Sequence, residues 1–120
     1  MENKFSEFME IVVTNAKPDY AEGYMVLREE LADELGHVTG GAYNALADAI
    51  GGEAARATGD MYVTQGCSQQ FYTSTEPKEG RLYARADVRH RGSRTCIVAV
   101  QLLHEDGEVV CDGQFSYSKI

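Results

Sequence analysis

Residues 36–48 read GHVTGGAYNALAD, and this stretch indicates how the whole chain folds. A double glycine at 40–41 follows Thr39, a residue type that is favoured at the N-cap of a helix. The sequence from there to Gly59 is rich in alanine and has few large side chains. Small side chains let a helix lie close to other backbone, so we expect a long helix wrapped by a sheet. Asp48 lies two turns inside this helix among small apolar residues, and a carboxylate at that place requires an explanation.

The composition of the chain limits its function. It has 120 residues, of which 43% are hydrophobic, and a formal net charge of -8. The length fits one compact domain, and the surplus of acidic residues argues against general binding to nucleic acid or to anionic membranes. No apolar run approaches the roughly 18 residues of a transmembrane helix, and the first residues lack the features of a secretory signal. We therefore expect one domain, residues 1–120, in the cytoplasm, with neither nucleic acid nor membrane as a partner.

Three cysteines are scattered along the chain. Cys67, Cys96 and Cys111 are odd in number, and no two of them have CxxC spacing. Neither a zinc site nor a disulfide framework is expected from this pattern. We predict that all three are small core residues in a reducing compartment and that the protein binds no metal.

Two elements are expected before the long helix. Apolar residues from Phe5 to Ala16 recur at helical spacing, and the Lys-Pro pair that follows would end a helix. This predicts an N-terminal helix within residues 1–18 that packs on the domain. A short strand is expected within residues 23–29, which contain the apolar run Tyr-Met-Val-Leu.

The second half of the chain predicts strands joined by short turns. Residues 61–73 form the first of them, and residues 81–89 alternate between apolar and polar side chains as a half-buried strand does. Residues 95–103 are apolar on both faces, which is typical of a central strand. A hairpin signal, Asp106 followed by glycine, precedes the last strand. Together these elements predict an α+β domain, with a curved antiparallel β-sheet wrapped around a central α-helix.

This order of elements resembles the hotdog-fold acyl-CoA thioesterases, especially the phenylacetate-degradation and 4-hydroxybenzoyl-CoA thioesterase group. The match rests on the double glycine 40–41 and on Leu-Ala-Asp at 46–48, with Val-Thr at 63–64 and the glycine turn at 91–94. It covers about residues 20–119. The resemblance implies a hotdog fold and hydrolysis of an acyl-CoA thioester to a carboxylic acid and free coenzyme A. No cofactor is implied, since coenzyme A is part of the substrate.

Two positions differ from the pattern of that group. Thr39 stands where the group has a histidine, and His37, two residues earlier, is not its equivalent. An asparagine or glutamine is common a few residues before the motif, and its place here falls at about Asp33. We therefore include Thr39 and Asp33 in the candidate catalytic site.

The chemistry of thioester hydrolysis assigns roles to the motif. The first amides of a helix have no internal partner, and the helix dipole places partial positive charge there, so Gly40 or Gly41 would supply an oxyanion-hole N–H. Asp48 would act either as a general base on water or as a nucleophile, and the sequence leaves both open. Eight residues separate Asp48 from Gly40, about 12 Å along a helix. One thioester cannot contact both, so the two groups would come from two chains. The resemblance likewise implies a homodimer with sites at its interface, and we expect two such dimers to form a homotetramer.

A basic cluster stands out in this acidic chain. It consists of Arg81, Arg85, Arg89, His90, Arg91 and Arg94. The cluster is either the solvated face of a strand or a dock for the phosphates of coenzyme A. Arg91 and Arg94 flank the turn formed by Gly92 and Ser93, where the group often holds the nucleotide, so we assign substrate binding to these four residues.

Two other functions stay open at this point. One is a non-catalytic hotdog protein that binds acyl-CoA, in which Asp48 would be an ordinary hydrogen-bonded or exposed helix acid and Asp33 a surface acid. The other is a hotdog dehydratase or hydratase, which would need a catalytic histidine beside an acid. His37 alone is a poor substitute for that histidine.

Overall fold

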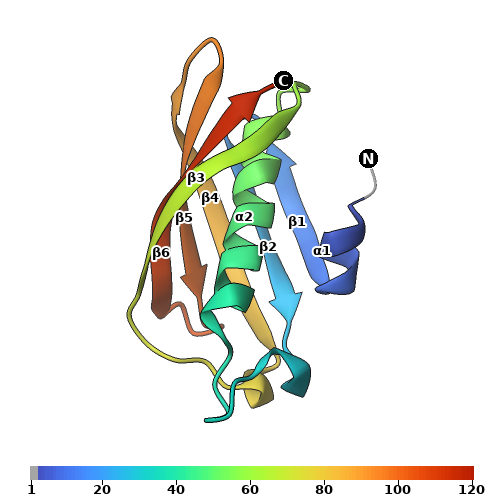
Figure 1. Ribbon diagram of the computed structural model, residues 1–120, viewed down its shortest axis with the longest axis vertical. Helices are drawn as coiled ribbons and strands as arrows, with labels where there is room; N and C mark the ends of the chain where they lie inside the picture. Colours follow the sequence, from blue (N-terminus) through green and yellow to red (C-terminus); the bar gives the residue numbers. More distant parts are fainter. Residues whose placement is uncertain (1–2) are drawn as a thin grey trace.

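A computed structural model describes residues 3–120 and shows a six-stranded antiparallel sheet curved around one long helix (Figure 1). The strand order is β1-β2-β4-β5-β6-β3, so β1 and β3 form the two edges. The strands are β1 (Ile11–Lys17), β2 (Tyr20–Val26), β3 (Tyr62–Phe71), β4 (Arg81–Arg91), β5 (Thr95–Leu103) and β6 (Val109–Lys119). The helices are α1 (Lys4–Phe8) and α2 (Gly40–Arg56), with short 3-10 turns at Glu29–Leu31 and Pro77–Glu79. The predicted α+β hotdog architecture is confirmed.

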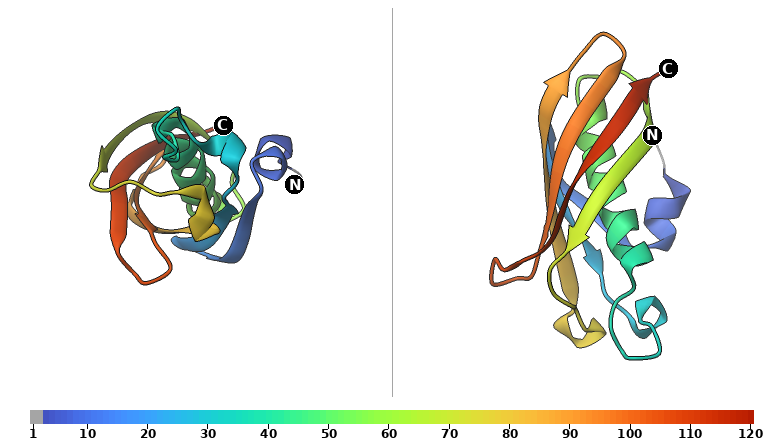
Figure 2. Two further views of the ribbon diagram at one scale, coloured as in Figure 1. Left: turned by 90° about the horizontal axis from the view of Figure 1, so that it is seen from below. Right: turned by 60° about the vertical axis from the view of Figure 1, so that its left-hand side comes forward.

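The long helix α2 fills the inside of the curved sheet, as the end-on view in Figure 2 shows. Leu46, Ala47 and Ile50 are completely buried and follow helical spacing along its inner face. They pack in one core with inward side chains of the central strands, among them Leu82 and Val100. The small residues of α2 therefore have the predicted effect of letting the sheet wrap closely. Among the described helices, none is long and apolar enough to cross a membrane.

The N-terminal helix is present, but the prediction of its length is wrong. The helix α1 ends at Phe8, and Glu10 has a φ of 56°, which a continuing helix does not allow. The chain then forms β1, which pairs with β2. Ile11 and the following Val-Val-Thr are β-branched residues, which favour a strand over a helix. The part of the prediction that concerns residues 1–2 lies outside the described residues.

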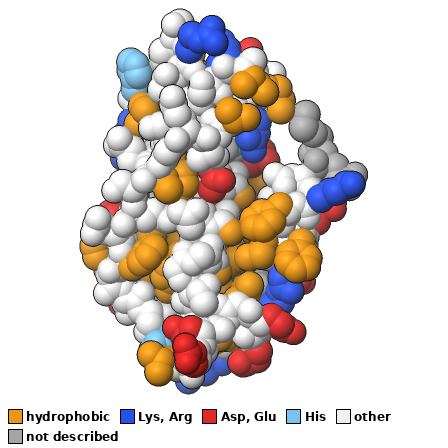
Figure 3. Space-filling view, in the orientation of Figure 1, with side chains coloured by type: hydrophobic (Ala, Val, Ile, Leu, Met, Phe, Trp, Pro, Cys, Tyr) orange, Lys and Arg blue, Asp and Glu red, His pale blue; other side chains and the backbone are white. Residues whose placement is uncertain are grey.

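One side of the molecule is left open by the sheet. Among the described strands, the edge strand β3 pairs with β6 only, and β3 is exposed over most of its length. Cys96 and Cys111 are buried as predicted, but the prediction is wrong for Cys67, which is exposed because it lies on this edge. Figure 3 shows this side, where charged side chains gather toward the margins and the central part is largely uncharged. The open side therefore combines an unpaired strand edge with an incompletely covered helix.

Candidate active site

Asp48 is half-buried on α2, and its carboxylate is anchored through one oxygen. The hydroxyl of Thr64 donates to Asp48 Oδ1 over 2.6 Å. The hydroxyl of Tyr117 donates to the Asp48 carbonyl oxygen over 2.9 Å and lies 3.3 Å from Oδ1. Within residues 3–120, Oδ2 has no hydrogen-bond donor. The carboxylate thus has one held oxygen and one oxygen available to another molecule.

The two hydroxyls reach Asp48 together because of the strand register. Thr64 on β3 lies directly opposite Tyr117 on β6, so both side chains arrive at the same level of α2. Burial, followed by the nearby Asp48 carboxylate, raises the pKa of Tyr117. The phenol therefore keeps its proton and stays a donor. The sequence identified Asp48, but neither hydroxyl partner was assigned to the site.

The helix N-terminus has the predicted cap. Thr39 has an extended backbone, and its hydroxyl accepts a hydrogen bond from the amide of Ala42 over 3.3 Å. Gly40 and Gly41, the first two residues of α2, are exposed. Their amides have no acceptor within residues 3–120. They are therefore available to an oxyanion, as the positive end of a helix dipole favours.

An aromatic hollow lies next to these amides. Its volume is about 300 Å³, and its walls include Gly40, Tyr43, Phe71 and Tyr72. The rings of Tyr43 and Phe71 meet edge to face with centroids 5.4 Å apart. A Cβ at Gly40 would come within 3.2 Å of the Phe71 ring, so glycine lets that ring approach the helix N-terminus. An apolar group bound here would lie beside the free amides.

A second hollow, of about 510 Å³, lies on the outer face of the sheet. Polar side chains such as Gln70, Asp87, Arg89 and Gln114 line it. The sheet stands between this hollow and α2, so it contains neither Asp48 nor the helix N-terminus. It is therefore not part of the candidate active site.

Asp33 is exposed in the loop before α2 and makes its hydrogen bonds there. Its Oδ1 accepts from the amides of Leu35, at 2.9 Å, and His37, at 3.0 Å. These backbone hydrogen bonds, that of His37 first, lower the pKa of Asp33. No hydrogen bond joins Asp33 to Asp48 within residues 3–120. In one chain Asp33 therefore shapes its loop, and a catalytic role would need a second copy.

The four residues of the predicted coenzyme A turn differ in what they contact. Arg91 Nε and Nη2 donate to Asp19 Oδ1 at 3.1 and 2.9 Å, while Nη1 donates to the Ala55 carbonyl at 3.1 Å and the Tyr62 hydroxyl at 3.2 Å. This guanidinium therefore caps the C-terminal end of α2 by a hydrogen bond to one of its last carbonyl groups. Arg94 is exposed and forms no ion pair within residues 3–120.

The turn itself continues between these two arginines. Gly92 is half-buried and donates its amide to the Thr95 carbonyl over 2.8 Å, while Ser93 is exposed. Of the two arginines, only the side chain of Arg94 is free to contact a phosphate.

Another polar group lies inside the fold near the helix N-terminus. Thr75 is completely buried, and its hydroxyl accepts from the Tyr43 hydroxyl at 2.7 Å and lies 2.9 Å from His104 Nε2. The Thr75 carbonyl accepts from the amide of Val38 at 2.8 Å. Thr75 thereby ties the loop before α2 to the sheet. None of these contacts was predicted from the sequence.

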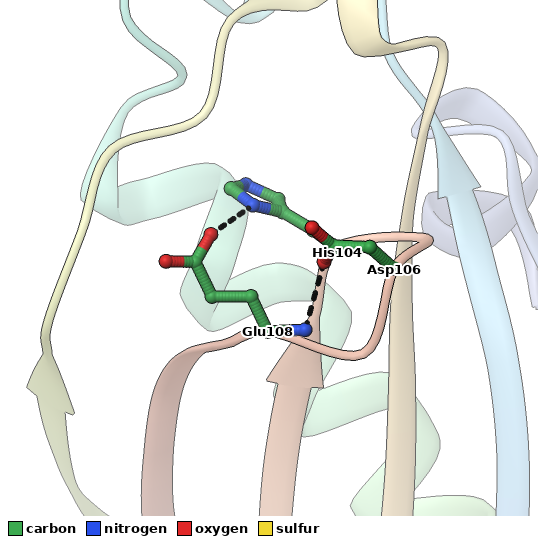
Figure 4. Close-up of side chains that lie close together, drawn as sticks. All are labelled: His104, Asp106 and Glu108. Atoms are coloured by element: carbon green, nitrogen blue, oxygen red, sulfur yellow. Dashed lines mark hydrogen bonds and ion pairs between the residues drawn. The ribbon is translucent and has the colours of Figure 1, made fainter.

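His104 also belongs to a small group at the β5–β6 turn (Figure 4). Its Nδ1 lies 2.9 Å from Glu108 Oε1, and Asp106 Oδ1 accepts from the Glu108 amide at 2.9 Å. Potential metal-ligating atoms of these three residues lie within 4.8 Å of one another. Both imidazole nitrogens already have partners, so hydrogen bonding within the turn explains the group. That the protein binds no metal stays a prediction.

Comparison with known proteins decides the family. Residues 35–111, more than half of the chain, match the model of the thioesterase superfamily. The chain belongs to this superfamily. The match includes the double glycine, Asp48 and Thr64. No curated protein sequence matches the chain significantly.

Solved structures of other proteins share the fold. The PaaI protein of the phenylacetic acid degradation operon of E. coli is 20% identical with a TM-score of 0.94, covering 99% of this chain and 86% of its own. The TT0310 protein of Thermus thermophilus is 24% identical with a TM-score of 0.92, and both chains are covered completely. A hypothetical thioesterase of Streptococcus pneumoniae, solved with coenzyme A, is 19% identical with a TM-score of 0.85, covering 92% of this chain and 85% of its own. At these identities the likeness shows the hotdog fold alone.

Proposed function

We propose that the protein hydrolyses an acyl-CoA thioester, with Asp48 as the catalytic carboxylate and the amides of Gly40 or Gly41 as the oxyanion hole. The observation that carries this proposal is the Asp48 carboxylate, held at Oδ1 and free at Oδ2 on the open side of the fold. Membership in the thioesterase superfamily and the fold shared with a coenzyme A-bound neighbour support it.

Asp48 has two ways to use its free oxygen. As a general base, Oδ2 takes a proton from water while the water oxygen attacks the thioester carbon. As a nucleophile, Oδ2 attacks that carbon itself and forms a mixed anhydride, which water then opens. In both routes the carbon–sulfur bond breaks, the sulfur takes up a proton, and the products are a carboxylic acid and free coenzyme A. The helix amides would stabilise the oxyanion that develops on the carbonyl oxygen.

The proposal requires a homodimer. Asp48 and Gly40 lie about 12 Å apart along one helix, too far for one carbonyl group to contact both. Two α2 helices that pack antiparallel across a two-fold axis would bring Asp48 of one chain to the N-terminus of the other. The open side suits such packing, because Gly41, Ala45 and Ala49 follow one another at four-residue spacing and are not buried.

The edge strand β3 supports the same dimer. Its ten residues carry no charged side chain, although an exposed strand edge is usually protected from pairing by charge or proline. Pairing of β3 with its copy across the two-fold axis would satisfy the backbone groups of this edge. Thr64 and Asp48 would then lie at the interface. Assembly of two dimers into a homotetramer, and residence in the cytoplasm, are proposals that rest on the resemblance and on the composition.

For the nucleotide part of the substrate, we assign phosphate binding to Arg94, with Gly92 and Ser93 shaping its turn. The Arg91 guanidinium holds Asp19 and the end of α2, so it contributes to this site through the position of the turn. An exposed arginine without an ion pair is a suitable partner for phosphate.

The alternative functions receive less support from the geometry. A dehydratase or hydratase would need a histidine close to the acid, and within residues 3–120 no histidine forms a hydrogen bond with Asp48. A non-catalytic acyl-CoA binder would explain the aromatic hollow and Arg94. It would not explain why Asp48 is held by two hydroxyls and leaves one oxygen free.

The test is thioester hydrolysis by wild type and by Asp48→Asn, measured as thiol release over a panel of acyl-CoA substrates. Asp48→Asn keeps the shape and removes the base, so we expect kcat to fall by about 10²–10⁴ while acyl-CoA binding, measured by calorimetry, persists. Glu53→Gln is the matched control, because Glu53 lies on the same helix and forms an ion pair with Arg56 rather than a hydrogen bond with Asp48. Full activity of Asp48→Asn would contradict the catalytic role and favour the non-catalytic binder.

A further inference from the structure

Tyr117 is buried in a way that fixes its hydroxyl. Only 1% of the residue is exposed, and its ring stacks on Phe115 with an interplanar angle of 17° and centroids 6.2 Å apart. The hydroxyl reaches the middle of α2, 69 residues away in the chain, and within residues 3–120 it forms hydrogen bonds with Asp48 alone. A buried phenol usually requires a hydrogen-bond partner, and here that partner is the candidate catalytic residue.

Gly51 provides the room for this hydroxyl. It lies one turn after Asp48 on α2, and a Cβ there would overlap the Tyr117 hydroxyl oxygen and come within 3.2 Å of Val100. Glycine is unfavourable inside a helix compared with alanine, which occupies most other small positions of α2. At the neighbouring Gly52 the three nearest atoms to an added Cβ all belong to the flexible end of Arg56, which can move aside. Of these two neighbouring glycines, it is therefore Gly51 whose lack of a side chain makes room for the Tyr117 hydroxyl.

We infer that Tyr117 is a positioning residue for Asp48, that Gly51 is kept small to admit its hydroxyl, and that the pair sets the orientation of the catalytic carboxylate. This inference rests on the proposed function. The Tyr117 hydroxyl holds the backbone carbonyl of Asp48 and approaches Oδ1, while Thr64 donates to Oδ1 from the other strand. With Oδ1 flanked by two hydroxyls, rotation of the carboxylate is restricted, and Oδ2 stays the oxygen that meets water or the thioester.

The first test removes the phenol oxygen alone. In Tyr117→Phe we expect kcat to fall about 10-fold, the effect of one lost hydrogen bond to a reacting group, with KM unchanged. Tyr20→Phe is the matched control, since Tyr20 also donates to a carboxylate, Glu22, at 2.7 Å, but on a strand away from Asp48. We expect the control to keep the wild-type kcat. An unchanged kcat in Tyr117→Phe would overturn the inference.

The second test asks whether Gly51 acts through the same hydroxyl. Gly51→Ala should lower kcat by about the same factor as Tyr117→Phe, because the new methyl group displaces the hydroxyl. In the double variant the overlap with the hydroxyl oxygen is gone, so its kcat should equal that of Tyr117→Phe. Gly52→Ala should keep the wild-type kcat. Losses that multiply in the double variant would show two separate effects and overturn the role given to Gly51.

The outcomes separate this inference from the proposed function. If wild type hydrolyses no acyl-CoA, the proposed function fails and the inference fails with it. If wild type is active and Tyr117→Phe is equally active, only the inference fails. If Gly51→Ala does not fold, the kcat and KM of Tyr117→Phe still decide the positioning role. A lower melting temperature with an unchanged kcat would assign Tyr117 to stability alone.

Discussion

Two hydrogen-bonded networks lie along α2, one with a threonine from β3 and the other with a threonine from the connection between β3 and β4. In the Asp48 network (Asp48, Thr64, Tyr117) the threonine is exposed, and the acceptor is a carboxylate with one free oxygen. In the Thr75 network (Tyr43, Thr75, His104) the threonine is completely buried, and each hydrogen-bonding partner lies within the fold. In the Asp48 network, Oδ2 is available to react with another molecule, while the Thr75 network has no such reactive atom among its described residues. Hydroxyl groups alone therefore do not mark the site, but an unsatisfied atom on an open side does.

The sharpest test of this comparison is the same substitution at both threonines. Thr64→Val should lower kcat about 10-fold, because Oδ1 loses a charge-assisted hydrogen bond. Stability should change little, because valine keeps the size and branching of the threonine side chain. Thr75→Val should instead lower the free energy of unfolding by about 1–3 kcal/mol, because the Tyr43 hydroxyl and His104 Nε2 each lose one hydrogen-bond partner inside the fold. Steady-state kinetics and urea denaturation of both variants provide the measurement. The comparison would be contradicted if Thr64→Val lowered the stability and kept the wild-type kcat, or if Thr75→Val lowered kcat and kept the wild-type stability.

A second comparison concerns Arg91 and Arg94. We expect Arg91 to affect the free energy of unfolding and Arg94 to affect KM for acyl-CoA. Arg91→Ala should lower the free energy of unfolding by about 1–3 kcal/mol, since the half-buried guanidinium satisfies the last carbonyls of α2. Arg94→Ala should raise KM for acyl-CoA with kcat unchanged, because a phosphate contact is uniform binding. A short thioester without the nucleotide serves as the control substrate. Equal losses on both substrates in Arg94→Ala would speak against phosphate binding.

Asp33 should produce the smallest effect. Its folded-state pKa is lowered by backbone hydrogen bonds in an exposed loop, those of His37 first. A carboxyl whose pKa is lowered by folding contributes stability above its unfolded pKa, and this contribution is lost as the pH falls through the folded pKa. Asp33→Asn should therefore lower the melting temperature slightly near pH 7, where the ionised carboxylate contributes stability, and flatten the decrease of melting temperature below about pH 4. Unchanged acid sensitivity would show that the loop hydrogen bonds do not contribute to stability.

Much of the fold was predictable because its signals are local. The alternation in residues 81–89 and the glycine turns locate β4, β5 and β6, and the double glycine locates the start of α2. The strand β1 was missed for a physical reason. Ile11 is its only buried residue, so no alternation between apolar and polar positions was present, and the spacing of its valines also fits a helix.

The site was predictable only in part. Asp48 and the glycines came from a motif that is continuous in sequence. The hydroxyl of Tyr117 reaches Asp48 through strand register and helix packing, which depend on the whole fold. Two features of the sequence are consistent with this hydrogen bond. Tyr117 lies on the inward face of its strand, where its hydroxyl needs a hydrogen-bond partner, and position 51 has glycine although alanine would stabilise the helix better. Neither feature shows from the sequence that Tyr117 and Gly51 lie next to each other.

The central claim is that each site takes Asp48 from one chain and the helix amides from another. Its most direct test is complementation between Asp48→Asn and a folded, inactive glycine variant. Gly40→Pro and Gly41→Pro are the candidates, since proline removes the amide hydrogen and is tolerated in the first helical turn. After the two inactive variants are mixed and allowed to exchange subunits, we expect about a quarter of the wild-type rate, because half of the dimers carry one intact site of two. A mixture no more active than its parents would contradict the shared site.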